Sequence, residues 1–230
     1  MSLALGLIGY WFLAYAVKSV TYPRDREPPR PFPRRWDTGH ESTIFFSIDF
    51  WFANVFKNRI KQFERRSLRS SLKEYIQLNN KVNLLVSACM FLALIAAYHA
   101  DDRSLLYQVL LAMSLIRYLS RSYEIAFAFG RDVLQGRRRQ SGLDKYERIR
   151  LALMSYMEVF IYSSAAYLAL PLIKDPMDAL SMSLNVGTLT NVGYAFGADA
   201  TLFSNLVFVQ VFCTLSLVVL SLASYLSREK

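Results

Sequence analysis

The sequence contains few cysteines and histidines, and this limits the chemistry that it can perform. Of its 230 residues, two are cysteines and two are histidines. Cys89 and Cys213 lie in long apolar segments, where free thiols usually behave as small hydrophobic side chains, so no disulfide framework is indicated. His40 and His99 are far apart in the chain, and no phosphate-binding glycine loop, nucleophile elbow or metal-ligand spacing occurs. We therefore expect neither an enzyme nor a bound cofactor.

The chain also lacks an internal repeat and a stretch with the composition of a soluble domain. It is 53% hydrophobic with a mean hydropathy of +0.21, and its nine excess positive charges are concentrated in a few regions. This profile is typical of a small integral membrane protein. Apolar segments of about the length that crosses a bilayer occupy residues 2–20, 82–100, 105–129, 151–173 and 201–226. The predicted fold is all-α, with about five transmembrane helices.

The basic residues orient these helices. Thirteen lysines and arginines lie in residues 21–81 and seven in residues 130–150, whereas residues 174–200 contain a single lysine. Because cytoplasmic loops are enriched in basic residues, the first two regions are predicted to be cytoplasmic and the third to face outward. Five crossings then place the N-terminus outside and the C-terminus in the cytoplasm. The predicted location is the plasma membrane of the cell, as a multi-pass protein.

The first apolar segment, residues 1–20, has two interpretations. It resembles a secretory signal peptide in length, and its cleavage would leave four crossings. It has no basic region before the apolar run and no convincing small-residue cleavage site, which favours a retained transmembrane helix.

Residues 21–81 are predicted to form a cytoplasmic region with three parts. Prolines alternate with arginines over residues 23–35, which indicates an extended juxtamembrane linker. An aromatic-rich run over residues 44–56 is too short to span and is predicted to lie as a helix on the inner leaflet. Residues 57–81 are basic with spaced apolar residues, as in an amphipathic helix. The lysines and arginines of residues 21–81 form a basic belt, which either binds anionic lipid headgroups or only orients the chain in the membrane. We expect no nucleic-acid partner for it.

A third region, residues 82–149, is predicted to form a two-helix membrane module with a basic cytoplasmic loop. The last region, residues 150–230, contains the most informative motif of the chain.

The run Thr188-Leu189-Thr190-Asn191-Val192-Gly193-Tyr194-Ala195 resembles the selectivity-filter signature of the potassium-channel superfamily. In that family an extended backbone turns carbonyl oxygens toward a narrow axis, where they replace the hydration shell of the ion. The resemblance implies a channel-like pore module, a homotetramer and K⁺ as the permeant ion. It further implies filter carbonyls at Val192, Gly193 and Tyr194, with Thr188 and Thr190 supporting the filter.

Two positions depart from the pattern of that family. Asn191 stands where the family usually has a threonine whose hydroxyl completes the innermost ion site, and Ala195 replaces a glycine. An amide carries a donor as well as an acceptor, and alanine tolerates positive φ less well than glycine. These changes keep a weakly selective cation channel as an alternative to a potassium channel.

A short helix is predicted immediately before this run. Asp175 reads as an N-cap, Pro176 as the first helical residue and Asp178 as a first-turn carboxylate, with the helix ending near Gly187. Such a helix is too short to cross a bilayer. It fits a re-entrant pore helix whose partly negative C-terminal end favours cations.

Ionisable residues within the predicted spans are candidates for function because their burial in hydrocarbon is costly. Arg117, Arg121 and Glu124 share one face of the third span by their spacing, and Glu158 lies at a similar depth in the fourth. The favoured interpretation is an inter-helix ion-pair cluster in which Glu158 neutralises Arg117 or Arg121. The alternative is voltage sensing, which normally needs several arginines at a three-residue repeat.

The last span has a polar pattern but no glycine, so a glycine-hinged gate is not indicated. Its candidates for a water-facing wall are Ser204, Asn205, Gln210, Thr214 and Ser221. The sequence predicts a tetrameric cation channel, with potassium as the favoured ion. The alternatives are a weakly selective cation channel, a non-conducting channel-like scaffold or accessory subunit, and a transporter or intramembrane enzyme that reuses the re-entrant loop.

Overall fold

The computed structural model describes residues 1–31, 47–64, 71–134, 142–169, 173, 175–190 and 201–218. Every regular element in these residues is a helix, which confirms the all-α prediction. The helices are α1 (Ser2–Val20), α3 (Ile48–Glu64), α4 (Ser71–Asp101), α5 (Leu105–Leu134), α6 (Lys145–Tyr167), α7 (Pro176–Gly187) and α8 (Thr201–Leu215).

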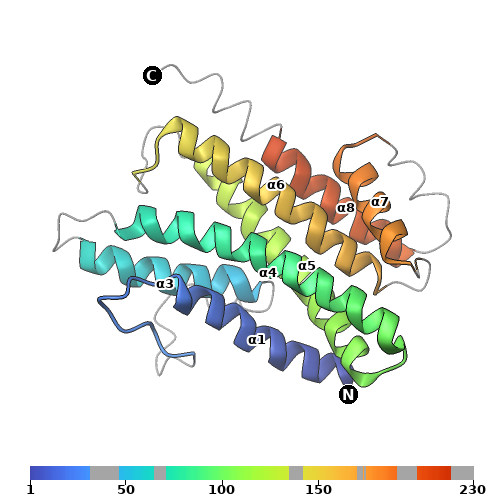
Figure 1. The fold of residues 1–230 in the computed structure, drawn as a ribbon. Helices are drawn as coiled ribbons and strands as arrows, with labels where there is room; N and C mark the ends of the chain where they lie inside the picture. Colours follow the sequence, from blue (N-terminus) through green and yellow to red (C-terminus); the bar gives the residue numbers. More distant parts are fainter. Residues whose placement is uncertain are drawn as a thin grey trace.

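The long helix α5 occupies the centre of the bundle. It packs against α1, α3, α4, α6 and α8, while α4 also lies along α6. In Figure 1, α1 and α3 lie on one side of the α4 and α5 pair, and α6, α7 and α8 lie on the other. Polar side chains on α5 are therefore surrounded by protein on several sides, and this arrangement determines where the charged groups of the chain meet.

The helix boundaries differ from the predicted spans in two places. α4 begins at Ser71, so the last part of the predicted amphipathic segment is continuous with the second span. α6 begins at Lys145, well before residue 151, because Asp144 caps it. The Asp144 side chain accepts from the N–H of Glu147 at 2.8 Å, and the Glu147 side chain accepts from the N–H of Asp144 at 2.9 Å. This reciprocal capping box satisfies two N–H groups at the helix start.

The aromatic face of the helix predicted to lie on the inner leaflet packs against other helices of the protein. Trp51, Phe52 and Phe56 of α3 are almost fully buried, together with Tyr10 of α1. Asp49 at the start of α3 accepts from the Ser120 hydroxyl of α5 at 2.7 Å. Residue spacing shows that α3 has an apolar face but not what covers it, and the position of the helix at the inner leaflet stays a prediction.

Two helices of the described chain are long and apolar enough to cross a membrane, judged by length and composition: Ser2–Val20 and Ser71–Asp101. A shorter apolar helix covers Asn205–Val218. The five-span topology therefore stays a prediction. α5 and α6 carry the charged residues Arg117, Arg121 and Glu158, and these side chains are buried between helices.

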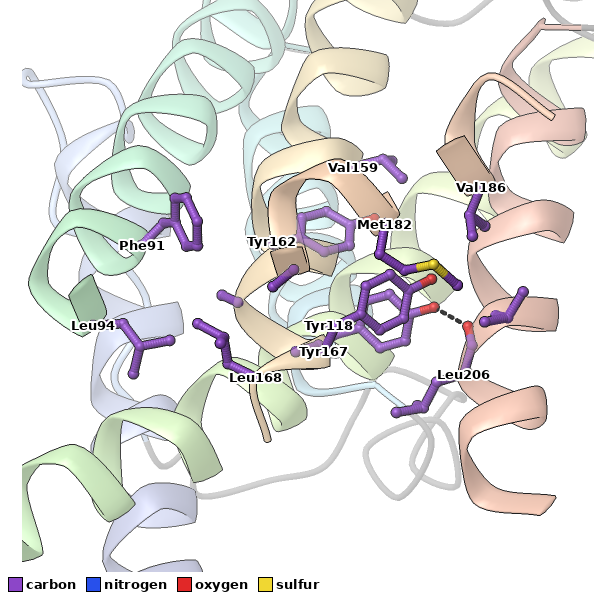
Figure 2. Packing of buried hydrophobic residues seen from close by; sticks show 14 of the residues in the cluster. Phe91, Leu94, Tyr118, Val159, Tyr162, Tyr167, Leu168, Met182, Val186 and Leu206 are labelled. Carbon is purple, nitrogen blue, oxygen red and sulfur yellow. Dashed lines mark hydrogen bonds between the residues drawn. The ribbon is translucent and has the colours of Figure 1, made fainter. Parts of the chain in front are cut away.

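A core of aromatic and aliphatic side chains joins α7 and α8 to the rest of the bundle. Tyr118 of α5 and Tyr162 of α6 lie with their rings 5.8 Å apart, beside Met182 of α7 (Figure 2). The Tyr118 hydroxyl donates to the backbone oxygen of Leu206 in α8. This bond satisfies the one polar atom of a ring that is otherwise buried among apolar groups.

Candidate functional site

The short helix predicted before the filter-like run is present as α7. The Asp175 side chain accepts from the N–H groups of Met177 at 2.7 Å and Asp178 at 3.3 Å. Pro176 is the first helical residue and lacks the N–H that would otherwise need a partner. The Asp178 carboxylate lies in the first turn, where the positive end of the helix dipole favours it. The predicted start of the helix is confirmed.

The C-terminal end of α7 closes with a Schellman motif. The N–H of Thr190 donates to the oxygen of Asn185 at 3.1 Å, and the N–H of Leu189 donates to the oxygen of Val186 at 3.1 Å. Leu189 occupies the left-handed position with φ of 59°, where glycine is usual. The last carbonyls of the helix are thus satisfied by N–H groups of the first residues of the filter-like run.

The hydroxyls of Thr188 and Thr190 reinforce this turn. Thr188 Oγ1 donates to the oxygen of Leu184 at 2.7 Å and lies 2.9 Å from Thr190 Oγ1. Both threonine side chains are exposed in the single chain. The structure therefore brings Thr188 and Thr190 together at the end of α7. The remaining predicted filter residues, Asn191, Val192, Gly193, Tyr194 and Ala195, lie outside the described residues.

One face of α7 is buried against α6 and α8. Ala179, Met182, Ser183, Val186 and Gly187 are buried, and their spacing of three or four residues places them on one side of the helix. A β-carbon at Gly187 would lie 2.0 Å from a ring carbon of Phe160 in α6. The absence of a side chain at Gly187 therefore lets α7 end directly against α6.

Gln210 of α8 connects α7 to α6 through hydrogen bonds. Its side-chain nitrogen donates to the backbone oxygen of Ser183 at 2.8 Å, and its oxygen accepts from the Tyr167 hydroxyl at 2.5 Å. Gln210 and Thr214 are fully buried within the chain. The sequence placed both on a water-facing wall, and this was wrong because Gln210 has buried polar partners on two neighbouring helices. Asn205 is exposed, whereas the side chains of Ser204 and Ser221 lie outside the described part.

Leu189→Gly should raise the free energy of unfolding slightly, by about 0.5 kcal/mol, because glycine adopts the left-handed conformation without steric cost. The matched control is Leu184→Gly inside α7, since both leucines are 42% exposed. Leu184 is helical, so its replacement should lower the free energy of unfolding by about 1 kcal/mol. Thermal or denaturant unfolding in one detergent measures both variants. Equal destabilisation by the two substitutions would contradict the conformational explanation.

Gln210→Leu should lower the free energy of unfolding by about 1–3 kcal/mol, because it leaves the Ser183 carbonyl and the Tyr167 hydroxyl without this buried partner. Thr214→Val is the matched control, one turn further along α8. Thr214 Oγ1 is buried and makes no hydrogen bond within the described residues, so its loss should be neutral or stabilising. Comparable losses in both variants would show that Gln210 contributes only packing volume.

The four charged residues predicted to form an intramembrane cluster lie together between α5 and α6. Arg121 Nε and Nη2 donate to the two carboxylate oxygens of Glu158 at 2.8 and 3.0 Å, and Arg117 Nη2 donates to Glu158 Oε1 at 3.2 Å. Arg121 also pairs with Glu124. All four side chains are at most 5% exposed. Glu158 therefore pairs with both arginines, where the sequence left open which one it would neutralise.

The cluster includes partners that the sequence reasoning did not identify. Lys18 of α1 is fully buried and pairs with Glu124 at 3.0 Å. On α4, Ser87 Oγ accepts from Arg117 Nη2 at 2.9 Å, and the backbone oxygen of Asn83 accepts from the same nitrogen at 3.0 Å. The sequence feature that could have pointed to Lys18 as a member of the cluster is that it is the one charged residue of the first predicted span. Nothing in the sequence indicated that α1 lies beside α5.

Comparisons of the chain with models of protein families, with curated proteins and with solved structures give no match. The functional argument for this chain therefore rests on its residues and their geometry.

Proposed function

We propose that the chain is one subunit of a tetrameric cation channel in the cell membrane, in which the backbone carbonyls of residues 190–195 coordinate a dehydrated K⁺ ion. The observation that carries this proposal is the position of the filter-like run. It follows directly after a helix that is capped at both ends and packed between α6 and α8. Figure 1 shows α7 beside α8 at the end of the bundle.

The geometry of α7 supports the role of a pore helix. Its 12 residues correspond to about 18 Å, which is well short of the hydrocarbon thickness of a bilayer. The partly negative C-terminal end of the helix dipole lies where the filter-like residues begin, and it favours a cation there. Thr188 and Thr190 hold this end in one conformation through their hydroxyl contacts. An ion path that starts at Thr190 would thus meet an ordered, electronegative helix end.

Exposed apolar side chains support assembly in a membrane. On α8, Phe208, Phe212 and Leu215 follow one another at spacings of four and three residues, and the first two are 57% and 66% exposed. On α4, Leu85 and Leu92 are 62% and 64% exposed. Soluble monomers rarely leave large apolar areas in contact with water. In the proposed channel, neighbouring subunits and lipid cover these faces, and the arrangement is multi-pass.

Purified protein in detergent and then in liposomes tests the proposal. Native mass measurement should give four copies, and liposomes with a potassium gradient should show flux that exceeds sodium flux under bi-ionic conditions. A monomer would overturn the proposal, because one chain supplies one carbonyl at each level of the filter. A tetramer without flux would favour the non-conducting scaffold. A conducting tetramer without ion preference would identify a weakly selective channel.

A further inference from the structure

A cavity of about 340 Å³ lies between α3, α4, α5 and α6, away from α7. This volume is large enough to admit a small molecule. The wall is partly apolar, and each of the four helices contributes to that part through Phe50, Ile76, Ile125 and Leu151. An uncharged, apolar molecule therefore enters the cavity without losing favourable hydration.

Lys57 of α3 differs from the other basic residues of this wall. The others take part in interactions of their own, and they are Lys61, Arg121, Arg131 and Arg148. Lys57 is only partly exposed, and it makes no hydrogen bond or ion pair within the described residues. Glu124, the one carboxylate among the described lining residues, already pairs with Lys18 and Arg121. The amine of Lys57 is therefore available for chemistry at the cavity.

Asn54 is a second lining residue with an unused polar group. It lies one turn before Lys57 on the same face of α3. Its side-chain nitrogen is buried and has no hydrogen-bond partner within the described chain. A buried N–H group without an acceptor is costly, and a lysine ammonium cannot help because it is itself a donor. A reaction that adds acceptor oxygens to the Lys57 nitrogen would supply the partner that Asn54 lacks.

We propose that Lys57 is a site of covalent modification by carbon dioxide, which adds to its uncharged amine to form a carbamate. The amine nitrogen forms a bond to the carbon, one C=O electron pair moves onto oxygen, and the proton released from nitrogen passes to water. No leaving group, oxidant or second reactant is needed. The carbamate places two acceptor oxygens on the face of α3 that carries Asn54. This site does not depend on whether the chain conducts ions.

The surroundings of Lys57 favour the uncharged amine, which is the reactive form. Burial is the largest cause and lowers the pKa of Lys57 to about 8. The charges of Lys18, Arg121 and Lys61 act in the same direction, whereas Glu124 acts against it. At neutral pH the uncharged fraction is then more than about a hundredfold larger than for a lysine in water. An aldehyde is a less suitable electrophile, because its protonated imine would keep a cation where no carboxylate pairs with it.

Carbamate trapping on the purified full-length protein in neutral detergent tests the site. The protein is equilibrated with isotopically labelled carbon dioxide and bicarbonate at neutral pH, alkylated with a trialkyloxonium salt, and digested for mass spectrometry. Lys57 should carry the labelled ester at an occupancy about tenfold or more above that of Lys73. Lys73 is the matched control, since it pairs with Glu147 and does not line the cavity. Equal occupancy of the two lysines, or no label at Lys57, overturns the proposal.

Two variants locate the label and its hydrogen-bond donor. Lys57→Arg should remove the label from this position of α3, because a guanidinium does not lose its proton in proteins. Label that persists there would show that another residue carries it. Asn54→Ala should lower the occupancy of Lys57 several-fold, because the carbamate loses a buried hydrogen bond. Unchanged occupancy in this variant would overturn the assignment of Asn54 as the donor.

Discussion

Gly193→Asp should abolish potassium-selective flux through the reconstituted protein while the assembly stays intact. Gly193 aligns with the filter glycine whose backbone bends toward the ion in the potassium-channel superfamily. A side chain there would distort the carbonyl positions, and a carboxylate would add a fixed charge in the ion path. The measurements are the bi-ionic reversal potential, or the corresponding ratio of potassium to sodium flux in liposomes, and the native mass of the same preparation.

The control for this substitution is Ser181→Asp. Ser181 is an exposed residue of α7, so the variant adds the same charge to the segment between α6 and α8 without changing the filter-like run. It should form the same oligomer and keep the wild-type ion ratio. A Gly193→Asp tetramer with unaltered flux and ion ratio would remove the filter assignment, and the scaffold alternative would then apply.

The features that the sequence predicted well depend on residues that are neighbours along the chain. The start of α7 was predictable because an N-cap, a first-turn proline and a first-turn carboxylate act within four residues of one another. The pairing of Arg117 and Arg121 with Glu158 was predictable because helical spacing sets the face of a residue, and burial makes an unpaired charge costly. In both cases a local rule was sufficient.

The features that the sequence missed depend on which helices are neighbours. Lys18 joins the charge cluster because α1 packs on α5, and the residue spacing within α1 contains no information about that contact. Gln210 looked like a pore-lining residue because polar side chains in a span often face water, yet its amide bridges Ser183 and Tyr167. The aromatic face of α3 could equally have met lipid or protein. A periodic pattern identifies a face but not its partner.

Glu158→Gln should destabilise the fold strongly, by about 3 kcal/mol, because it leaves two buried guanidinium groups without their shared carboxylate. The neutral amide also turns an N–H donor toward one of the arginines. Glu147→Gln is the matched control, because Glu147 is also in α6 and pairs with Lys73 but is solvent-accessible. Its hydrogen bond with Lys73 holds the pKa of Glu147 below its usual value, yet water replaces such a pair readily. The control should unfold close to the wild-type temperature in the same detergent.

Removing a partner charge as well should recover part of this loss, and the two arginines should differ in how much they recover. Arg121 donates two hydrogen bonds to Glu158 and Arg117 donates one, which is 3.2 Å long. We expect Glu158→Gln with Arg121→Gln to show the larger coupling energy, within the range of about 0.5–3 kcal/mol found for residues in contact. Arg117 keeps the Asn83 oxygen and the Ser87 hydroxyl as acceptors, so its coupling should be smaller. The unfolding temperatures of the single and double variants give both energies. Strictly additive losses for both arginines would show that Glu158 is not their common partner, and would make voltage sensing by Arg117 and Arg121 the better interpretation.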